Sequence, residues 1–518
     1  MNYDCINLPT DELLQKFIER DSDIQEFYQR LAFDQESIDK VASRSPHPHT
    51  QVLAEVIEAE MAPFGLTEAQ HINIKKLKNN HRVIIGGQQA GLLLSPQYIL
   101  HKIYTILILQ KEVKDKYGYD AVPVFWIAGE DHDYDEVNHT YVYDSYHKKV
   151  KKIAYKPNLN VPMSIGFYEY DKQAMRDTFI SIIKAVGDSK DKKPLINKIF
   201  EMIDDYTYWT ELFHAIVHEM FKETGLLIIN SHSPSVRALE IPMFKTLIDK
   251  SEEINTAFRE GQQRFNNTFK VAPTIETETD MHLFINSTSN RELISSDQYS
   301  KSELKKHLHD KPESFSNNVV TRPIMQEMMF NTLMFVGGGA EVKYWGEIYK
   351  VFDVLDIPMP IIVKRMEFMY VTESLIDSMK NNDLSISSSL PSQVEDKKSA
   401  IVSEMIDNDV IDAINNIRTR IPELYAPLHE CIDDVSKQLS VKNESLQLKQ
   451  IDYLERRYMI EQKRKVRTQL NTLDSYTDIL YPEGVLQERK YHALMLTTKP
   501  WEIPPLSYTT KLILIKTL

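Results

Sequence analysis

Two short polar segments contain the residue types that could do chemistry. GEDHDYDEVNH places six ionisable side chains within seven positions, directly after the apolar run VPVFWIA. Such crowding is electrostatically unfavourable unless cations, hydrogen bonds or a substrate amine offset it, and perturbed titrations of this kind cluster at functional sites. We therefore predict that Glu130, Asp131, His132 and Asp133 are catalytic. The alternative is a solvated acidic turn, and the sequence does not say which residue would be the base.

The second segment, GGQQAGLLLSP, joins an apolar strand to a helix. Free amides at such a helix start attract anions such as phosphate or carboxylate. The glycines allow close backbone approach, and the glutamines offer donors and acceptors, so we predict ligand binding by Gly86, Gln88, Gln89 and Gly91, and by Lys102 in the helix that follows. The glycines could equally be structural, because the spacing is neither G-x-G-x-x-G nor a Walker P-loop.

A third segment contains TRPIMQE and GGGAEVKYWGE. Arg322 could bind a carboxylate or phosphate bidentately, and three glycines precede another helix start. The predicted ligand-binding residues here are Arg322, Gly337, Gly338, Gly339, Tyr344 and Trp345, to which Asn138 of the acidic segment is added. Tyr344 and Trp345 could instead belong to the core.

Metal and thiol chemistry receive less support from the sequence. His132 and His139 with nearby carboxylates could hold a divalent metal, but their spacing matches no standard zinc pattern, so no metal ligand is predicted. Neither Cys5 nor Cys431 lies near the three polar segments, which disfavours a thiol nucleophile.

Five buried strands would position these segments, near residues 82–86, 122–128, 226–230, 333–337 and 360–364. Continuous apolar runs separated by helices are typical of an α/β fold with a doubly wound, Rossmann-like parallel sheet, where ligands bind beyond the carboxyl ends of the strands. Ser95 and Pro96 predict a helix start, and that helix runs to Gly118.

The rest of the chain is predicted to support this sheet. Residues 1–80 form an N-terminal helical segment, and residues 81–370 form the core, with insertions near 140–195 and 235–320. Residues 371–475 form a long antiparallel helical coiled coil, and residues 476–518 dock back on the core. Pro422 and Pro427 argue against one unbroken helix there. The predicted apolar seam contains Val410, Ile414, Ile417, Ile421, Leu424 and Leu428.

The composition of the chain limits the classes of binding partner that are expected. The formal net charge of −14 over 518 residues disfavours an extended nucleic-acid surface and favours small molecules. Two distant cysteines exclude a disulfide framework and fit a reducing cytoplasm. We recognise no signal peptide and no apolar run long enough to cross a membrane, so a cytoplasmic protein is expected.

Five ordered blocks carry a family resemblance: GGQQAGLLLSPQYILHK, PVFWIAGEDHDYDEVNH, NVVTRPIMQE, GGGAEVKYWGEI with MPIIVKR, and PEGVLQERKYHAL. Together they resemble the bacillithiol biosynthesis cysteine-adding enzymes, the BshC family, over essentially the whole chain. Two departures are that GGGAE replaces a Gly-Pro-Gly-Glu type loop and VKR replaces a common Pro-Arg.

The resemblance implies a Rossmann core akin to class I aminoacyl-tRNA synthetases and a coiled coil that supports a homodimer. It also implies a cysteine ligase that joins cysteine to the glucosamine amine of glucosaminyl-malate, the last step of bacillithiol synthesis. Cysteine would need an activated carboxyl, so ATP or another nucleotide is the implied cofactor, although the chain has no HIGH or KMSKS sequence. Metal use stays open.

On this resemblance, residues 86–91 would cradle phosphate or carboxylate, residues 130–133 would hold and deprotonate the amine, and Arg322 would anchor the malate. Two alternatives remain. One is a nucleotidylyltransferase or aminoacyl-tRNA-synthetase-like enzyme with another substrate. The other is a non-catalytic coiled-coil scaffold with a vestigial pocket.

Overall fold

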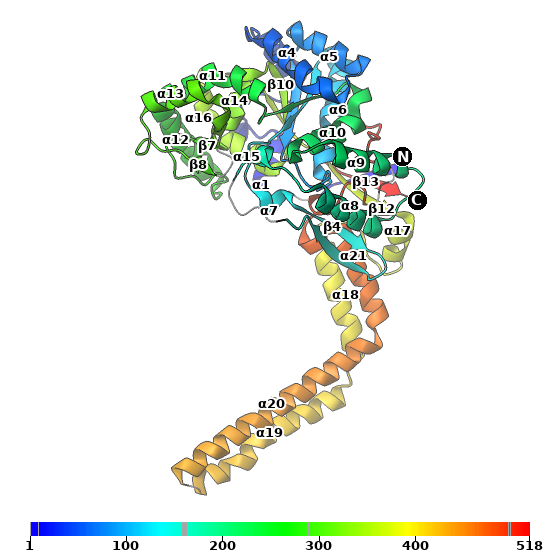
Figure 1. The fold of residues 1–518 in the computed structure, drawn as a ribbon. Coiled ribbons are helices and arrows are strands. Elements are labelled where there is room, and N and C mark those ends of the chain that lie inside the picture. Colours follow the sequence, from blue (N-terminus) through cyan, green and yellow to red (C-terminus); the bar gives the residue numbers. More distant parts are fainter. Residues whose placement is uncertain are drawn as a thin grey trace. The chain divides into compact units, whose positions relative to one another are not determined.

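The computed structural model describes residues 2–517 except 9, 158–162, 287–289, 432, 496 and 498. The chain divides into two compact units (Figure 1). The first, here called the sheet unit, contains residues 1–145, 150–373 and 485–518, and the second, the helical unit, contains residues 146–149 and 374–484.

A five-stranded parallel sheet organises the sheet unit. Its strands are β2 (Val83–Gln88), β3 (Val122–Ile127), β6 (Leu227–Asn230), β10 (Thr332–Gly337) and β11 (Ile361–Lys364), in the spatial order β11-β10-β2-β3-β6. The predicted Rossmann-like sheet is therefore confirmed. The strand order reverses between β2 and β10, and this switch point is where open α/β sheets bind ligands.

Helix α6 (Tyr98–Tyr117) connects β2 to β3 and is buried along most of its length because it packs on the sheet. It ends at Gly118, which adopts the left-handed conformation (φ 69°). The predicted helix start at Ser95 and Pro96 is wrong, since the helix begins at Tyr98 without a side-chain cap. Ser95 Oγ instead bonds Thr140 Oγ1 at 2.5 Å, so it is not available to cap the helix.

Other helices share a hydrophobic cluster with alternate residues of the sheet. Residues of β2, β3, β6 and β10 pack there with α4 (Thr50–Met61), α5 (Glu68–Lys78), α11 (Pro234–Asp249), α12 (Ser251–Phe269) and α15 (Gly339–Glu347). Successive strand residues point to opposite faces, so a strand buried on both sides needs the continuous apolar sequence found here.

Shorter elements complete the sheet unit. The helices are α1 (Glu12–Glu19), α2 (Ser22–Gln25), α3 (Gln35–Ala42), α7 (Tyr134–Val137), α8 (Lys172–Val186), α9 (Lys193–Asp205), α10 (Trp209–Phe221), α13 (Lys301–Asp310), α14 (Thr321–Met329) and α16 (Tyr349–Val354). Two small sheets lie in the inserted segments: β4 (His139–Asp144) with β5 (Lys149–Ala154), and β8 (Arg291–Leu293) with β7 (Leu283–Asn286) and β9 (Phe315–Asn317).

Both ends of the chain meet in a fourth sheet. Strand β13 (Leu512–Thr517) pairs with β1 (Asn2–Ile6) and with β12 (Glu367–Thr372). The prediction that residues 1–80 are helical is therefore wrong for Asn2–Ile6. The partner strand lies some five hundred residues away in sequence, so no local pattern could reveal the pairing.

The helical unit contains α18 (Leu390–Glu404), α19 (Asn408–Cys431), α20 (Asp434–Lys465) and α21 (Arg467–Leu480), with α17 (Glu373–Lys380) at its start. Helices α19 and α20 run side by side (Figure 1). Helix α19 is continuous through Pro422 and Pro427, so the predicted break is wrong. Both prolines are exposed, where water can bond the carbonyls that lose their helical partner.

The apolar seam of this hairpin also differs from the prediction. Ile414 is buried, whereas Ile417, Leu424 and Leu428 are exposed. Positions facing α20 include Arg418, which pairs with Asp452 at 3.3 Å. The contact between the two helices is therefore partly polar, and much apolar surface stays outside it.

Candidate functional site

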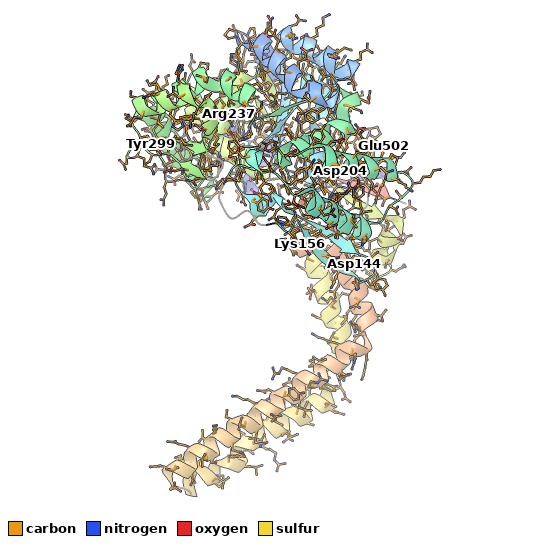
Figure 2. All side chains as sticks on the ribbon, viewed as in Figure 1. Asp144, Lys156, Asp204, Arg237, Tyr299 and Glu502 are labelled. Atoms are coloured by element: carbon orange, nitrogen blue, oxygen red, sulfur yellow. The ribbon has the colours of Figure 1, made fainter. Side chains whose placement is uncertain are left out.

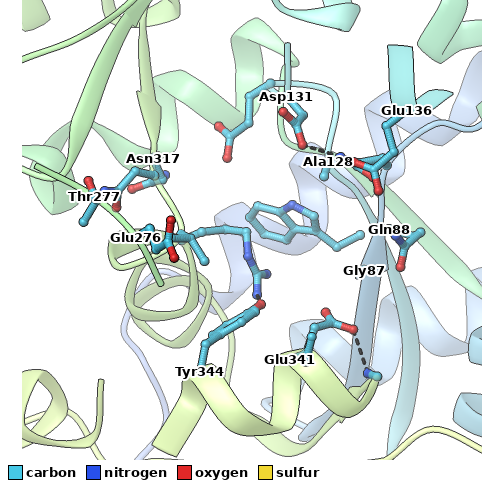
Figure 3. Close-up of a pocket in the computed structure, with 18 of the residues that line it drawn as sticks. Gly87, Gln88, Ala128, Asp131, Glu136, Glu276, Thr277, Asn317, Glu341 and Tyr344 are labelled. Atoms are coloured by element: carbon cyan, nitrogen blue, oxygen red, sulfur yellow. Dashed lines mark hydrogen bonds between the residues drawn. The ribbon is translucent and has the colours of Figure 1, made fainter. Parts of the chain in front are cut away.

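A cavity of about 920 Å³ lies at the carboxyl ends of β2, β3 and β10 (Figure 3). This volume is in the range of small-molecule sites. It is lined by Gln88 at the end of β2, by Lys102 in α6, by Asp131 after β3 and by Gly338 after β10. The three predicted polar segments therefore meet at the switch point of the sheet.

Gln89 connects the glycine segment to the acidic segment. Its Nε2 donates to Asp131 Oδ2 at 2.6 Å and to Glu136 Oε2 at 2.9 Å. The Leu92 amide donates to the Val137 carbonyl at 2.9 Å, and the Trp209 indole donates to the Ala90 carbonyl at 2.6 Å. These bonds hold the two loops together and aim the carboxylates of Asp131 and Glu136 at the cavity.

Glu130 lines the cavity from a buried ion-pair cluster. It pairs with Arg237, whose guanidinium also pairs with Glu240 at 2.5 Å. Figure 2 marks Arg237, which is 1% exposed. Burial raises the pKa of Glu240 to about 7, because the charged form loses its hydration. Glu130 is thus held in place by one guanidinium that serves two carboxyl groups.

Asp131, His132 and Asp133 have different surroundings. Asp131 Oδ1 accepts the His132 amide at 2.7 Å, and Asp133 accepts the Glu136 amide at 3.1 Å as the N-cap of α7. His132 Nδ1 lies 2.6 Å from Arg291 Nη1, and burial together with Arg291 lowers the pKa of His132. Of the three, only Asp131 lines the cavity.

The glycines divide into packing and lining positions. A Cβ on Gly91 would lie 1.8 Å from the Ser95 carbonyl oxygen, and a Cβ on Gly86 would lie 2.9 Å from the Val336 carbonyl oxygen. Neither residue lines the cavity, so both allow close packing of the chain and the predicted role as a ligand cradle does not apply to them. Gly338 and Gly339 do line it.

Lys102 is buried at the floor of the cavity. Its ammonium donates to the Gly87 carbonyl at 2.6 Å, to Gln88 Oε1 at 3.1 Å and to Glu341 Oε2 at 2.5 Å. Burial lowers its pKa. Because an ammonium has three donors, all of them are used in this arrangement.

The third segment contributes Arg322 and Tyr344. Arg322 Nη2 donates to the Tyr344 hydroxyl at 2.7 Å, and both side chains line the cavity. Trp345 instead packs in the core between Phe335 and Phe352. Gly337 is the last residue of β10, and Asn138 is the C-cap of α7. Neither of these predicted residues lines the cavity.

Several lining residues escaped prediction. The second insertion supplies a cavity wall, and a segment after the helical unit supplies another. The added polar residues are Tyr98, Glu136, Glu276, Thr277, Glu278, Arg291, Asn317, Asn318, Glu341, Arg365 and Arg489. Glu136, Glu341, Arg365 and Arg489 all lie within blocks that carry the family resemblance, which was the available signal. The insertion gave no such signal, because its sequence is polar and irregular.

The described part of the chain has neither a metal-binding cluster nor a membrane-spanning helix. It holds no group of three or more His, Cys, Asp or Glu side chains placed to bind a metal ion. Within the same residues, no helix is both long enough and apolar enough to cross a membrane.

A parallel sheet in this order, with a polar cavity at its switch point, defines a Rossmann-like α/β enzyme. Family models agree with this class. "Bacillithiol biosynthesis BshC, N-terminal Rossmann-like domain" matches residues 1–366, and "Bacillithiol biosynthesis BshC, C-terminal coiled-coil domain" matches residues 368–500. The chain therefore belongs to the BshC family.

Individual relatives match along nearly their whole length. A protein of Staphylococcus carnosus is 35% identical over 526 residues and one of Staphylococcus saprophyticus is 36% identical over 531 residues, with 98% of each chain covered in both cases. Both carry the name "Putative cysteine ligase BshC".

Proposed function

We propose that this protein is a cysteine ligase that joins cysteine to the glucosamine amine of glucosaminyl-malate, forming bacillithiol. Family membership supports a ligase of bacillithiol biosynthesis. The observation that carries the finer proposal is the charge pattern of the cavity. Carboxylates after β3 can receive an amine, while Arg322 can receive an acidic group of malate.

Proton transfer falls to Asp131 and Glu136 in this proposal. A bound amine is protonated at neutral pH and must lose a proton before its nitrogen can attack a carboxyl carbon. Partial burial raises the pKa of Glu136, which makes it a stronger base than an ordinary carboxylate. Asp131, joined to it through Gln89, would hold the ammonium while Glu136 takes the proton.

An activated cysteine carboxyl is also part of the proposal, with ATP or another nucleotide as the candidate activator. The glycine turns do not fit a triphosphate in this arrangement, because all three Lys102 donors are used and the Gly338 amide donates to Glu341 Oε2 at 2.7 Å. No step is therefore assigned to a nucleotide.

We further propose a cytoplasmic homodimer formed through α19 and α20. Apolar side chains on these helices stay exposed, for example 65% of Leu424 and 67% of Leu439. A second copy that covered this apolar face would remove it from water.

The test is product formation by the purified protein. Cysteine, glucosaminyl-malate and ATP, or other nucleotides in turn, are incubated with it, and the thiol product is measured by mass spectrometry. We expect Glu136→Gln and Asp131→Asn each to lower kcat by about 10²-fold to 10⁴-fold, the usual contribution of a general base. Asp135→Asn is the matched control, since Asp135 lies in the same run but does not line the cavity.

Two results of this assay would contradict the proposal. Absence of thiol product with wild-type protein and every nucleotide would refute the ligase proposal. Near-normal turnover by folded Glu136→Gln and Asp131→Asn proteins would remove this pair from proton transfer.

A further inference from the structure

A small cavity of about 130 Å³ adjoins the large one at Arg489. Tyr98, Glu136 and Arg489 line both cavities, and the small one continues to His139 and Lys490. It equals roughly four water volumes of ~30 Å³ each. The space therefore suits one compact polar group of a larger ligand.

The Arg489 side chain is exposed, and its guanidinium forms no hydrogen bond or ion pair with any residue that the structure describes, although its backbone amide donates to the Leu486 carbonyl at 2.9 Å. Other arginines of the large cavity are engaged. Arg365 pairs with Glu488 through both terminal nitrogens, at 3.0 and 2.5 Å, and Arg322 donates to Tyr344. Arg489 thus retains its planar set of donors, which matches an oxyanion bidentately.

Buried contacts fix the backbone next to Arg489. Gln487 accepts the Tyr370 amide at 2.8 Å and donates to the Tyr370 carbonyl at 3.0 Å. Glu488 is fully buried, where it bonds Arg365 and lies 2.5 Å from His101 Nδ1. The exposed arginine is therefore presented from a rigid segment, which lowers the entropy lost when it binds a ligand.

The net charge of the small cavity favours an anion. Arg489 and Lys490 supply two positive charges, and Lys490 Nζ lies 4.7 Å from the centre of the Tyr141 ring. Glu136 supplies one negative charge, and its carboxylate already accepts the Gln89 amide. Burial and Lys152 lower the pKa of His139, so its ring stays neutral near pH 7.

We propose that Arg489, with Lys490, forms a subsite for a carboxylate of the amine-bearing acceptor. This inference rests on the proposed function and extends it, because it assigns malate recognition to a segment that follows the helical unit. Glu136 lines both cavities, so an acceptor whose carboxylate lies at Arg489 would reach the proposed base with its amine.

The experiment compares Arg489→Gln, Arg489→Lys and wild type with two acceptors, glucosaminyl-malate and methyl glucosaminide, which has the amine but no carboxylate. We expect Arg489→Gln to raise KM for glucosaminyl-malate by about 10-fold to 100-fold, the usual effect of losing a charged hydrogen bond. KM for cysteine and for any nucleotide should change less than about 2-fold. The KM of Arg489→Lys for glucosaminyl-malate should lie between those of wild type and Arg489→Gln. Arg30→Gln, at an exposed arginine, is the matched control.

Methyl glucosaminide separates recognition of the carboxylate from general damage to the site. The KM for methyl glucosaminide should be equal in wild type and Arg489→Gln, because this acceptor has no carboxylate for Arg489 to bind. An equal loss with both acceptors overturns the subsite, as does an unchanged KM for both. A rise in KM for the nucleotide instead would show that Arg489 binds phosphate, which also overturns the assignment.

Calorimetric titration with glucosaminyl-malate separates this inference from the proposed function. If wild type forms no product yet binds glucosaminyl-malate, and Arg489→Gln binds it at least about 10-fold more weakly, the subsite stands and the ligase proposal fails. Equal binding by both proteins, or none by wild type, overturns the subsite.

Discussion

Glu240 should make the stability of the sheet unit depend on pH near neutrality. It is fully buried on α11, one turn after Arg237, and its Oε1 has no hydrogen-bond partner within the described structure. Burial raises its pKa from 4.5 to about 7. The folded state therefore holds a proton on Glu240 that the unfolded chain has released in this range.

The direction and size of the change in stability with pH follow from this shift in the pKa of Glu240. Stability from the protonated carboxyl is complete below about pH 4.5 and is lost as the pH rises through about 7. Each pKa unit corresponds to about 1.36 kcal/mol, so the full loss is about 3 kcal/mol. Glu240→Gln stays neutral throughout and should lack this part of the pH dependence.

Urea unfolding between pH 4.5 and 8 measures the difference. We expect the free energy of unfolding of wild type to fall by about 3 kcal/mol relative to Glu240→Gln over this interval. Glu253→Gln, at an exposed position of the neighbouring α12, is the control and should follow wild type. Parallel curves for wild type and Glu240→Gln would refute the reasoning.

Two further predictions concern packing and assembly. Gly91→Ala places its Cβ against the Ser95 carbonyl and should lower the free energy of unfolding by more than about 3 kcal/mol. Gly118→Ala, whose Cβ would lie in open space, should lower it by about 1 kcal/mol. Equal thermal midpoints for the two variants would contradict this prediction. Replacing Leu424 and Leu439 together by serine should convert the proposed dimer to a monomer in sedimentation velocity, and a retained dimer would show that these side chains do not form its interface.

The parallel sheet could be predicted because its signal is local. Strands such as Val122–Ile127 are continuous apolar runs, and each leads into a polar loop at the same edge of the sheet. The same logic placed Asp131, Gln88 and Arg322 in one cavity.

The remaining errors arise where distant contacts decide the outcome. Asn2–Ile6 becomes a strand because Leu512–Thr517 lies beside it, and Gly86 packs closely against Val336 of β10. Trp345 lies in the core because Phe335 and Phe352 enclose it. None of these partners is marked by spacing, so sequence reasoning could name the residue types and not their neighbours.

The chain order of the cavity walls has a consequence for synthesis on the ribosome. Arg489 and Glu488 follow the whole helical unit, residues 374–484, yet they complete the wall around Arg365. The emerging polypeptide can assemble β2, β3, β6, β10 and β11 before these residues exist, because domains fold as their segments appear. A nascent chain that stalls within the helical unit would therefore carry a cavity that lacks the wall supplied by Arg489, and premature termination there should yield protein with an incomplete cavity.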